Sequence, residues 1–73
     1  MSKLPRVSGA DVVKALEKAG FHFIRQHGSH IILRRLDPFA QTTVPNHREL
    51  DRGALRAIIR QAGLSVDEFN RLL

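Results

Sequence analysis

The side chains of this sequence that can exchange a proton near neutral pH are its four histidines. Imidazole has an ordinary pKa of about 6.5, which suits both general acid and general base catalysis. His30 follows the predicted tight turn His27-Gly28-Ser29 and opens an apolar-rich segment, so it stands at the start of a predicted strand. A side chain on a rigid element beside a tight turn is well placed for catalysis. Position alone favours a solvated histidine at a strand end, with no catalytic role.

The remaining histidines have weaker patterns around them. His47 lies in a Pro-x-His segment, where it could contact phosphate, act as a second acid or base, or belong to an ordinary loop. His22 and His27 are expected on the surface. His27 and His30 are three residues apart, but structural zinc usually has four ligands, often thiolates. Because the sequence has no cysteine and no cluster of histidines with carboxylates, it predicts no metal site and no cofactor.

The charge of the chain is strongly basic. Twelve Lys and Arg against seven Asp and Glu give a net charge of +5, and nine of the twelve are arginine. Arginine binds phosphate and carboxylate in a bidentate manner. The balance therefore favours a nucleic acid, an acidic protein or a membrane surface as partner, or it serves solubility alone. A stripe of arginines four residues apart is formed by Arg52, Arg56 and Arg60. This stripe could track phosphates, meet an acidic partner or be a solvated helix face.

The spacing of apolar residues predicts the elements that position these side chains. A helix over residues 8–20 has Ser8 as its cap and Gly20 at its end. Strands are predicted over residues 21–26, 30–36 and 41–44, because apolar residues alternate there between turn signals. A second amphipathic helix runs from a cap at Asp51 to about residue 62, and a capping box over residues 65–68 begins a short last helix.

This order predicts an α+β fold of the double-stranded-RNA-binding type, α-β-β-β-α, with a short C-terminal helix. The three strands should form an antiparallel sheet with the helices on one face. Alternation along the second strand directs Ile31 and Leu33 to the core and leaves His30 and Arg34 on the open face. Arg35, next to Arg34, should point toward the helices and extend its stem to the edge.

Length and composition limit the class of protein. We expect one domain over residues 1–73, with no disulfide framework, as is typical of a reducing compartment. No segment approaches the ~20 apolar residues of a membrane span, and the first residues have no apolar signal-peptide core. These observations predict a cytoplasmic protein with no membrane partner.

Four segments together resemble the HicA toxin family in order and spacing. They are Gly20-Phe21, Gly28-Ser29-His30, the run from Thr43 to His47 (TVPNH), and the run from Gly53 to Leu64 (GALRAIIRQAGL). The resemblance extends from about Arg6 to Leu73. It implies a double-stranded-RNA-binding-like fold, an mRNA-degrading activity and neutralisation by a HicB-type antitoxin. It also identifies His30, in Gly-Ser-His, as the catalytic histidine.

The resemblance and the residues together predict a metal-independent endoribonuclease. His30 would act as general base on a ribose 2′-OH or as general acid on the leaving oxygen, while arginines stabilise the phosphate. The residues expected to bind RNA or support the site are Gly28, Ser29, Arg34, His47 and Arg48. Two rival functions share these features: an RNA-binding module without catalysis, and a protein-interaction adaptor that never contacts RNA.

Overall fold

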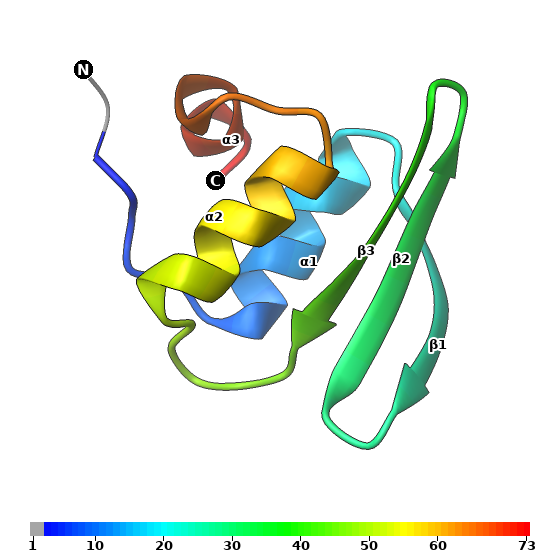
Figure 1. Cartoon of the computed structure of the whole chain (residues 1–73), viewed down its shortest axis with the longest axis horizontal. Helices are drawn as coiled ribbons and strands as arrows, with labels where there is room; N and C mark the ends of the chain where they lie inside the picture. The colour runs from blue at the N-terminus through cyan, green and yellow to red at the C-terminus, as the bar shows by residue number, and fades with distance from the viewer. Residues whose placement is uncertain (1–2) are drawn as a thin grey trace.

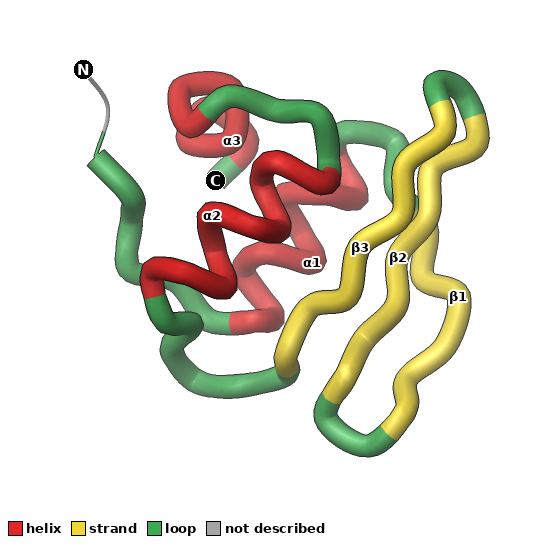
Figure 2. Tube along the Cα trace, in the orientation of Figure 1, coloured by secondary structure: helices red, strands yellow, loops and turns green. Residues whose placement is uncertain are grey.

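The computed structural model describes residues 3–73; Met1 and Ser2, which fall within the domain expected from the sequence, lie outside this range. The elements follow the predicted order, and the fold is α+β (Figures 1 and 2). They are α1 (Gly9–Lys18), β1 (His22–His27), β2 (His30–Leu36), β3 (Phe39–Pro45), α2 (Arg52–Gln61) and α3 (Val66–Leu72). The strands form one antiparallel sheet in the order β1-β2-β3. No helix in the described range is long and apolar enough to cross a membrane.

Each helix begins at a side-chain cap that the sequence predicts. The Ser8 hydroxyl accepts from the Asp11 backbone N–H at 3.0 Å, and the Asp11 carboxylate accepts from the Ser8 N–H at 3.1 Å. The same reciprocal box joins Ser65 and Glu68 at the start of α3. At α2 the Asp51 carboxylate accepts from the Ala54 N–H at 2.7 Å. These bonds satisfy donors that the first turn of a helix leaves without an intrahelical partner.

The long helices α1 and α2 end in the same way. Gly20 has φ +94° and Gly63 has φ +76°, the left-handed conformation that glycine adopts without steric cost. The backbone then turns back, so that the Phe21 N–H donates to Leu16 and the Leu64 N–H donates to Ile59. Both are Schellman motifs, which satisfy carbonyls of the last helical turn. Each motif turns the chain sharply away from the helix axis.

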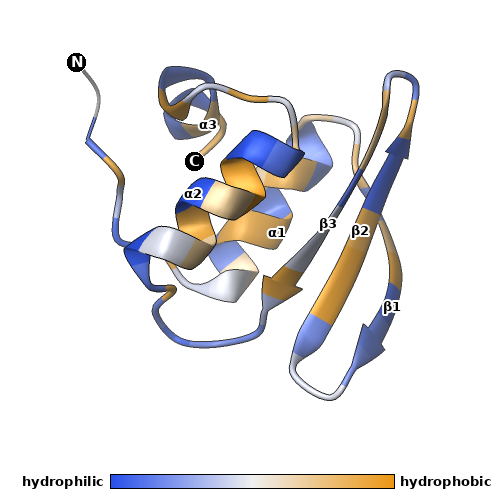
Figure 3. Cartoon of the chain, viewed as in Figure 1, coloured by the Kyte–Doolittle hydropathy of each residue, from blue (hydrophilic) through white to orange (hydrophobic). Residues whose placement is uncertain are grey.

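The hydrophobic core lies between the helices and one face of the sheet. Helices α1 and α2 pack against β3, and α3 packs against α1 (Figure 1). Figure 3 shows a hydrophobic stretch in the middle of β2. The largest fully buried side chains are Phe21, Phe69, Leu16, Leu33, Leu55, Val12 and Val44. Strand β1 contributes none, and all six of its residues are exposed, so the helices cover β2 and β3 only.

The strand boundaries differ from the prediction in two places. Phe21 was expected to open the first strand, but it lies in the connection after α1 with its ring in the core. Strand β3 spans seven residues rather than the short segment 41–44, because Leu36 and Phe39 pair across a two-residue turn at Asp37-Pro38. A register shift between Phe23 and Arg25 breaks the alternation of β1. Phe23 lies on this edge strand and is exposed.

Candidate active site

The turn before His30 is a two-residue hairpin formed by Gly28 and Ser29. Gly28 has φ +58° and Ser29 has a negative φ, the combination found in type II′ turns. A Cβ at position 28 would meet no atom within 4 Å, so the backbone conformation, and not crowding, favours glycine there. The Gln26 side-chain amide donates to the Gly28 carbonyl at 3.0 Å and braces the turn.

His30 is exposed on the sheet face that points away from α1 and α2, which we call the open face. Its neighbours Ile31 and Leu33 are buried on the opposite face, as the alternation along β2 predicts. The pairing partner of His30 on β1 is His27, and its partner on β3 is Pro45. Because paired residues of an antiparallel sheet point to the same side, the imidazoles of His27 and His30 are neighbours on the open face.

The next two rows of the open face carry further basic groups. One row is Arg25, Ile32 and Thr43, and the next is His22, Arg34 and Gln41. The Arg34 guanidinium Nε donates to Gln41 Oε1 at 2.8 Å, which holds this side chain in the plane of its row. The three strands contain no acidic residue. The open face is therefore a basic surface that begins at the His27–His30 pair.

The loop that carries His47 and Arg48 is tied to the turn before His30. The Asn46 N–H donates to the Ser29 carbonyl at 2.6 Å, and the His47 carbonyl accepts from the Gly9 N–H at 2.9 Å. A Cβ on Gly9 would overlap the Pro45 carbonyl, so the start of α1 approaches this loop as closely as the backbone allows. Both His47 and Arg48 are exposed. The structure thus brings together two segments 17 residues apart, and the hydrogen bond between Asn46 and Ser29 joins them.

The other candidate groups lie elsewhere. Arg52, Arg56 and Arg60 are exposed on α2, on the helical side of the molecule, and do not share the open face. Arg35 points toward the helices, as predicted. Among residues 3–73 no three His, Cys, Asp or Glu side chains are grouped as metal ligands.

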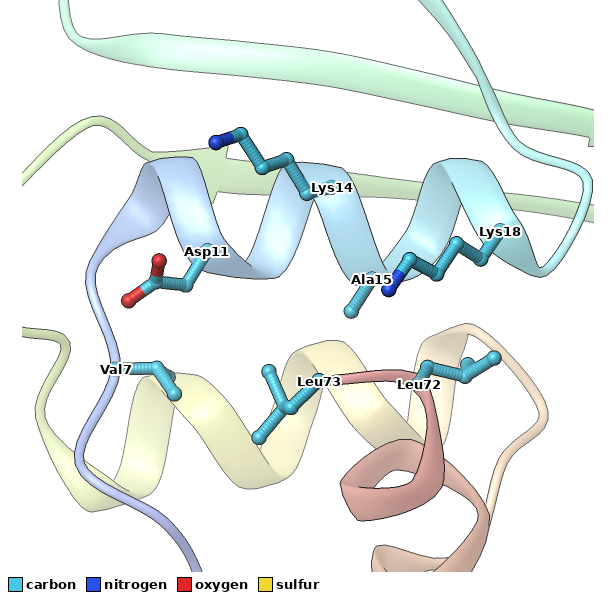
Figure 4. A pocket seen from close by; sticks show the side chains of 7 residues that line it. All are labelled: Val7, Asp11, Lys14, Ala15, Lys18, Leu72 and Leu73. Carbon is cyan, nitrogen blue, oxygen red and sulfur yellow. The ribbon is translucent and has the colours of Figure 1, made fainter.

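A hollow of about 250 Å³ lies between α1 and the C-terminal residues, with Lys14 and Lys18 on its rim (Figure 4). It is formed by the helices and is separate from the His30 surface.

Two features of the open face were not predicted from the sequence. One is the pairing of His27 with His30. His27 was predicted to be exposed, but no pairing partner was predicted for it. The other is a pair of exposed apolar residues, Leu36 and Phe39, at the far end of the same face. The sequence does contain a signal for the His27–His30 pairing, because the residues that flank a two-residue turn at Gly28-Ser29 face each other.

Comparison with known proteins identifies one family. The model of this family, described as the HicA toxin of bacterial toxin–antitoxin systems, matches residues 9–64. A comparison with curated proteins finds no match. The matched range is well over half of the chain and contains the Gly28–His30 turn, all three strands and the loop at His47. The chain therefore belongs to the HicA family, the toxins of bacterial toxin–antitoxin systems.

Proposed function

We propose that this toxin is a metal-independent endoribonuclease that cleaves mRNA in the cytoplasm and is neutralised by a HicB-type antitoxin. The observation that carries the proposal is the placement of His30. Its exposed imidazole stands at a rigid hairpin end, on a sheet face whose strands hold histidines and arginines and no carboxylate. A polyanion is the ligand that such a surface attracts most strongly.

The reaction is transesterification within the RNA strand. A general base removes the proton of a ribose 2′-OH, and the 2′-oxygen attacks the adjacent phosphorus. The bond from phosphorus to the 5′-oxygen of the next nucleotide breaks, and a general acid protonates that oxygen. The products are a 2′,3′-cyclic phosphate end and a free 5′-OH end. His30 fills one of the two proton-transfer roles.

Two other imidazoles are candidates for the second role. His27 is the pairing partner of His30 on the same face. His47 lies on the loop whose backbone is bonded to Ser29. Gly28 and Ser29 contribute through the backbone, by shaping the turn and by anchoring that loop. Arg34 and Arg48 supply positive charge for the phosphate oxygens, whose negative charge increases in the transition state.

The test uses purified protein, EDTA and a single-stranded RNA labelled at its 5′ end. We expect cleavage without divalent metal and products that end in a 2′,3′-cyclic phosphate. An oligonucleotide in which one ribose is replaced by 2′-deoxyribose should resist cleavage at that position only. RNA that is bound but never shortened would instead identify a binding module, and an absence of both binding and cleavage would identify an adaptor.

A further inference from the structure

The far end of the open face carries two large apolar side chains that are mostly exposed. Leu36 is 75% exposed and Phe39 is 68% exposed, the two highest values among the large hydrophobic residues of residues 3–73. They pair across the β2–β3 turn. Leu36 is an even number of residues from His30 and from Arg34 along β2, so the three side chains point to the same face of the sheet. Both therefore lie on the open face, together with the candidate catalytic histidine. Neither side chain is part of the hydrophobic core, which lies on the other face of the sheet.

Hydrogen bonds from Arg35 brace the backbone of this hairpin end. The turn between Leu36 and Phe39 has only two residues. The Arg35 Nε donates to the Pro38 carbonyl at 2.9 Å, and the same guanidinium reaches the carbonyls that end α1 and α2. An apolar pair on a braced hairpin loses little conformational freedom when a ligand covers it.

The order of groups along the open face resembles a track for a single nucleic-acid strand. The His27–His30 row comes first, the Arg34–Gln41 row stands between, and the Leu36–Phe39 row comes last. Leu36 is six residues beyond His30, a distance of about 20 Å along the strand. Surfaces that bind single strands combine cationic groups for the backbone with aromatic rings on which bases stack.

We propose that Phe39, supported by Leu36, is a base-stacking subsite for single-stranded RNA, remote from the bond that is cut. The proposal rests on the proposed endoribonuclease function. It assigns the hairpin end a role in substrate affinity and leaves the chemistry to His30. A substrate must extend several nucleotides from the cleaved phosphate to reach Phe39, so long RNA should be preferred over short RNA.

Charge and chemistry favour RNA over a protein as the occupant. The apolar row adjoins Arg34, whose guanidinium is oriented by Gln41, and the strands carry no acidic side chain, although the exposed Asp37 lies in the turn beside the row. An aromatic ring beside a fixed cation suits a nucleotide, whose base and phosphate need these two groups. Phe23 offers a matched comparison, because it is 55% exposed but pairs with Leu33 and so lies on the opposite face at the sheet edge.

The test measures binding apart from cleavage. Single-stranded oligoribonucleotides of about 4 to 16 nucleotides, the range that such surfaces cover, are titrated by fluorescence anisotropy in a His30→Ala background. We expect Phe39→Ala to weaken binding of the long oligonucleotides roughly 5- to 150-fold, the range for loss of one stacked base. The shortest oligonucleotides should be affected little. Phe39→Trp should retain affinity, Phe39→Leu should lose it, and Phe23→Ala should match the parent.

Several results would overturn the subsite. Equal affinity of Phe39→Ala and its parent for long RNA would do so, as would full retention by Phe39→Leu, which has no aromatic ring. Unchanged RNA binding with a weakened antitoxin complex would assign the hairpin to a protein partner instead. The two proposals fail separately. Protein that binds long RNA through Phe39 but never cleaves it would refute the endoribonuclease alone, and cleavage that ignores Phe39 at every substrate length would refute the subsite alone.

Discussion

At the scale of single residues, the His30 imidazole decides whether this surface is catalytic. We expect His30→Ala to lower the rate of RNA cleavage about 10²- to 10⁴-fold, the usual contribution of general acid–base catalysis. The side chain is exposed, so its removal leaves no buried cavity and the fold should persist. Cleavage assays in EDTA, with circular dichroism on both proteins, measure the two effects. His22→Ala is the matched control, because His22 is an exposed histidine two rows away on the same face.

The same assay separates the candidates for the second proton-transfer group. Variants His27→Ala and His47→Ala each remove one imidazole close to the Gly28-Ser29 turn. The variant with the larger loss of kcat, and with one limb missing from the pH profile of kcat, identifies the second group.

A His30→Ala protein that cuts RNA at the parent rate would contradict the assignment of His30 and transfer the chemistry to another residue.

Arg34 belongs to the same scale and reports on phosphate binding. Its guanidinium is positioned by Gln41 on the open face. We expect Arg34→Ala to weaken RNA binding and to flatten the plot of log K against log salt concentration by about 0.7 for each phosphate that the variant no longer neutralises. Arg56→Ala, on the exposed side of α2, should leave this slope unchanged. An equal change in both variants would mean that overall charge, and not the open face, determines binding.

At the scale of elements, Arg35 joins the hairpin to both long helices. Its guanidinium donates to Ala19 at the end of α1 and to Ala62 at the end of α2, and it stacks 4.7 Å from the centre of the Phe21 ring. A cation is favourable there, because helix C-termini carry partial negative charge. We expect Arg35→Ala to lower the free energy of unfolding by about 2–4 kcal/mol, because the variant lacks the charged hydrogen bonds and the cation–π interaction.

Urea denaturation of three variants tests this role of Arg35. Arg35→Lys keeps the charge but cannot span both carbonyls, so its loss of stability should be intermediate. Arg71→Ala removes an exposed arginine near the end of α3 and serves as the control. Arg35→Ala with the stability of the parent would show that the Schellman motifs alone hold the helix ends.

The capping boxes predict how the helices respond to acid. Backbone hydrogen bonds from Ser8 and Ser65 lower the pKa values of Asp11 and Glu68 below their ordinary values of 3.8 and 4.5. A carboxylate with a lowered native pKa stabilises the fold above its unfolded pKa, and this contribution disappears as the pH falls through the native pKa. We therefore expect Tm to drop on acidification below about pH 4.5. In the double variant Asp11→Asn, Glu68→Gln the drop should be smaller, and an identical drop would place the acid sensitivity elsewhere.

At the scale of the whole molecule, the protein has two dissimilar sides. The open face is basic and bears the candidate site, whereas the helical side holds the hollow rimmed by Lys14 and Lys18 (Figure 4). An acidic antitoxin that neutralises by occlusion should cover the open face. We expect Arg25→Glu with Arg34→Glu to weaken the complex at least tenfold, because like charges then oppose each other across the interface.

The control for this prediction reverses two charges on the helical side. Lys14→Glu with Lys18→Glu changes the net charge by the same amount and should leave antitoxin affinity within a few-fold of the parent. Affinity for both variants is measured by titration calorimetry at fixed salt. A complex that tolerates the arginine changes, or that still cuts RNA at the free-toxin rate, would show that neutralisation does not operate by occlusion of this face.

The sequence by itself determined the features that depend on neighbours along the chain. Caps at Ser8, Asp51 and Ser65 act within one helical turn, and alternation along β2 assigns His30 and Leu33 to opposite faces over a few residues. The element order and the open face therefore followed from local pattern. Glycine and proline marked the ends of both long helices and the turns between the strands, but the turn before β3 is two residues long and not four as predicted.

Only the tertiary structure decided which distant groups meet. The register shift in β1, the exposure of Phe23 and the length of β3 depend on pairing between strands, which no local pattern records. Arg35 was expected to point toward the helices, but two of its three carbonyl partners lie 16 and 27 residues away in the sequence. Likewise Leu36 and Phe39 became one apolar row only when β2 folded back onto β3. Contacts of this kind are chosen by packing of the whole chain, since each element alone allows many partners.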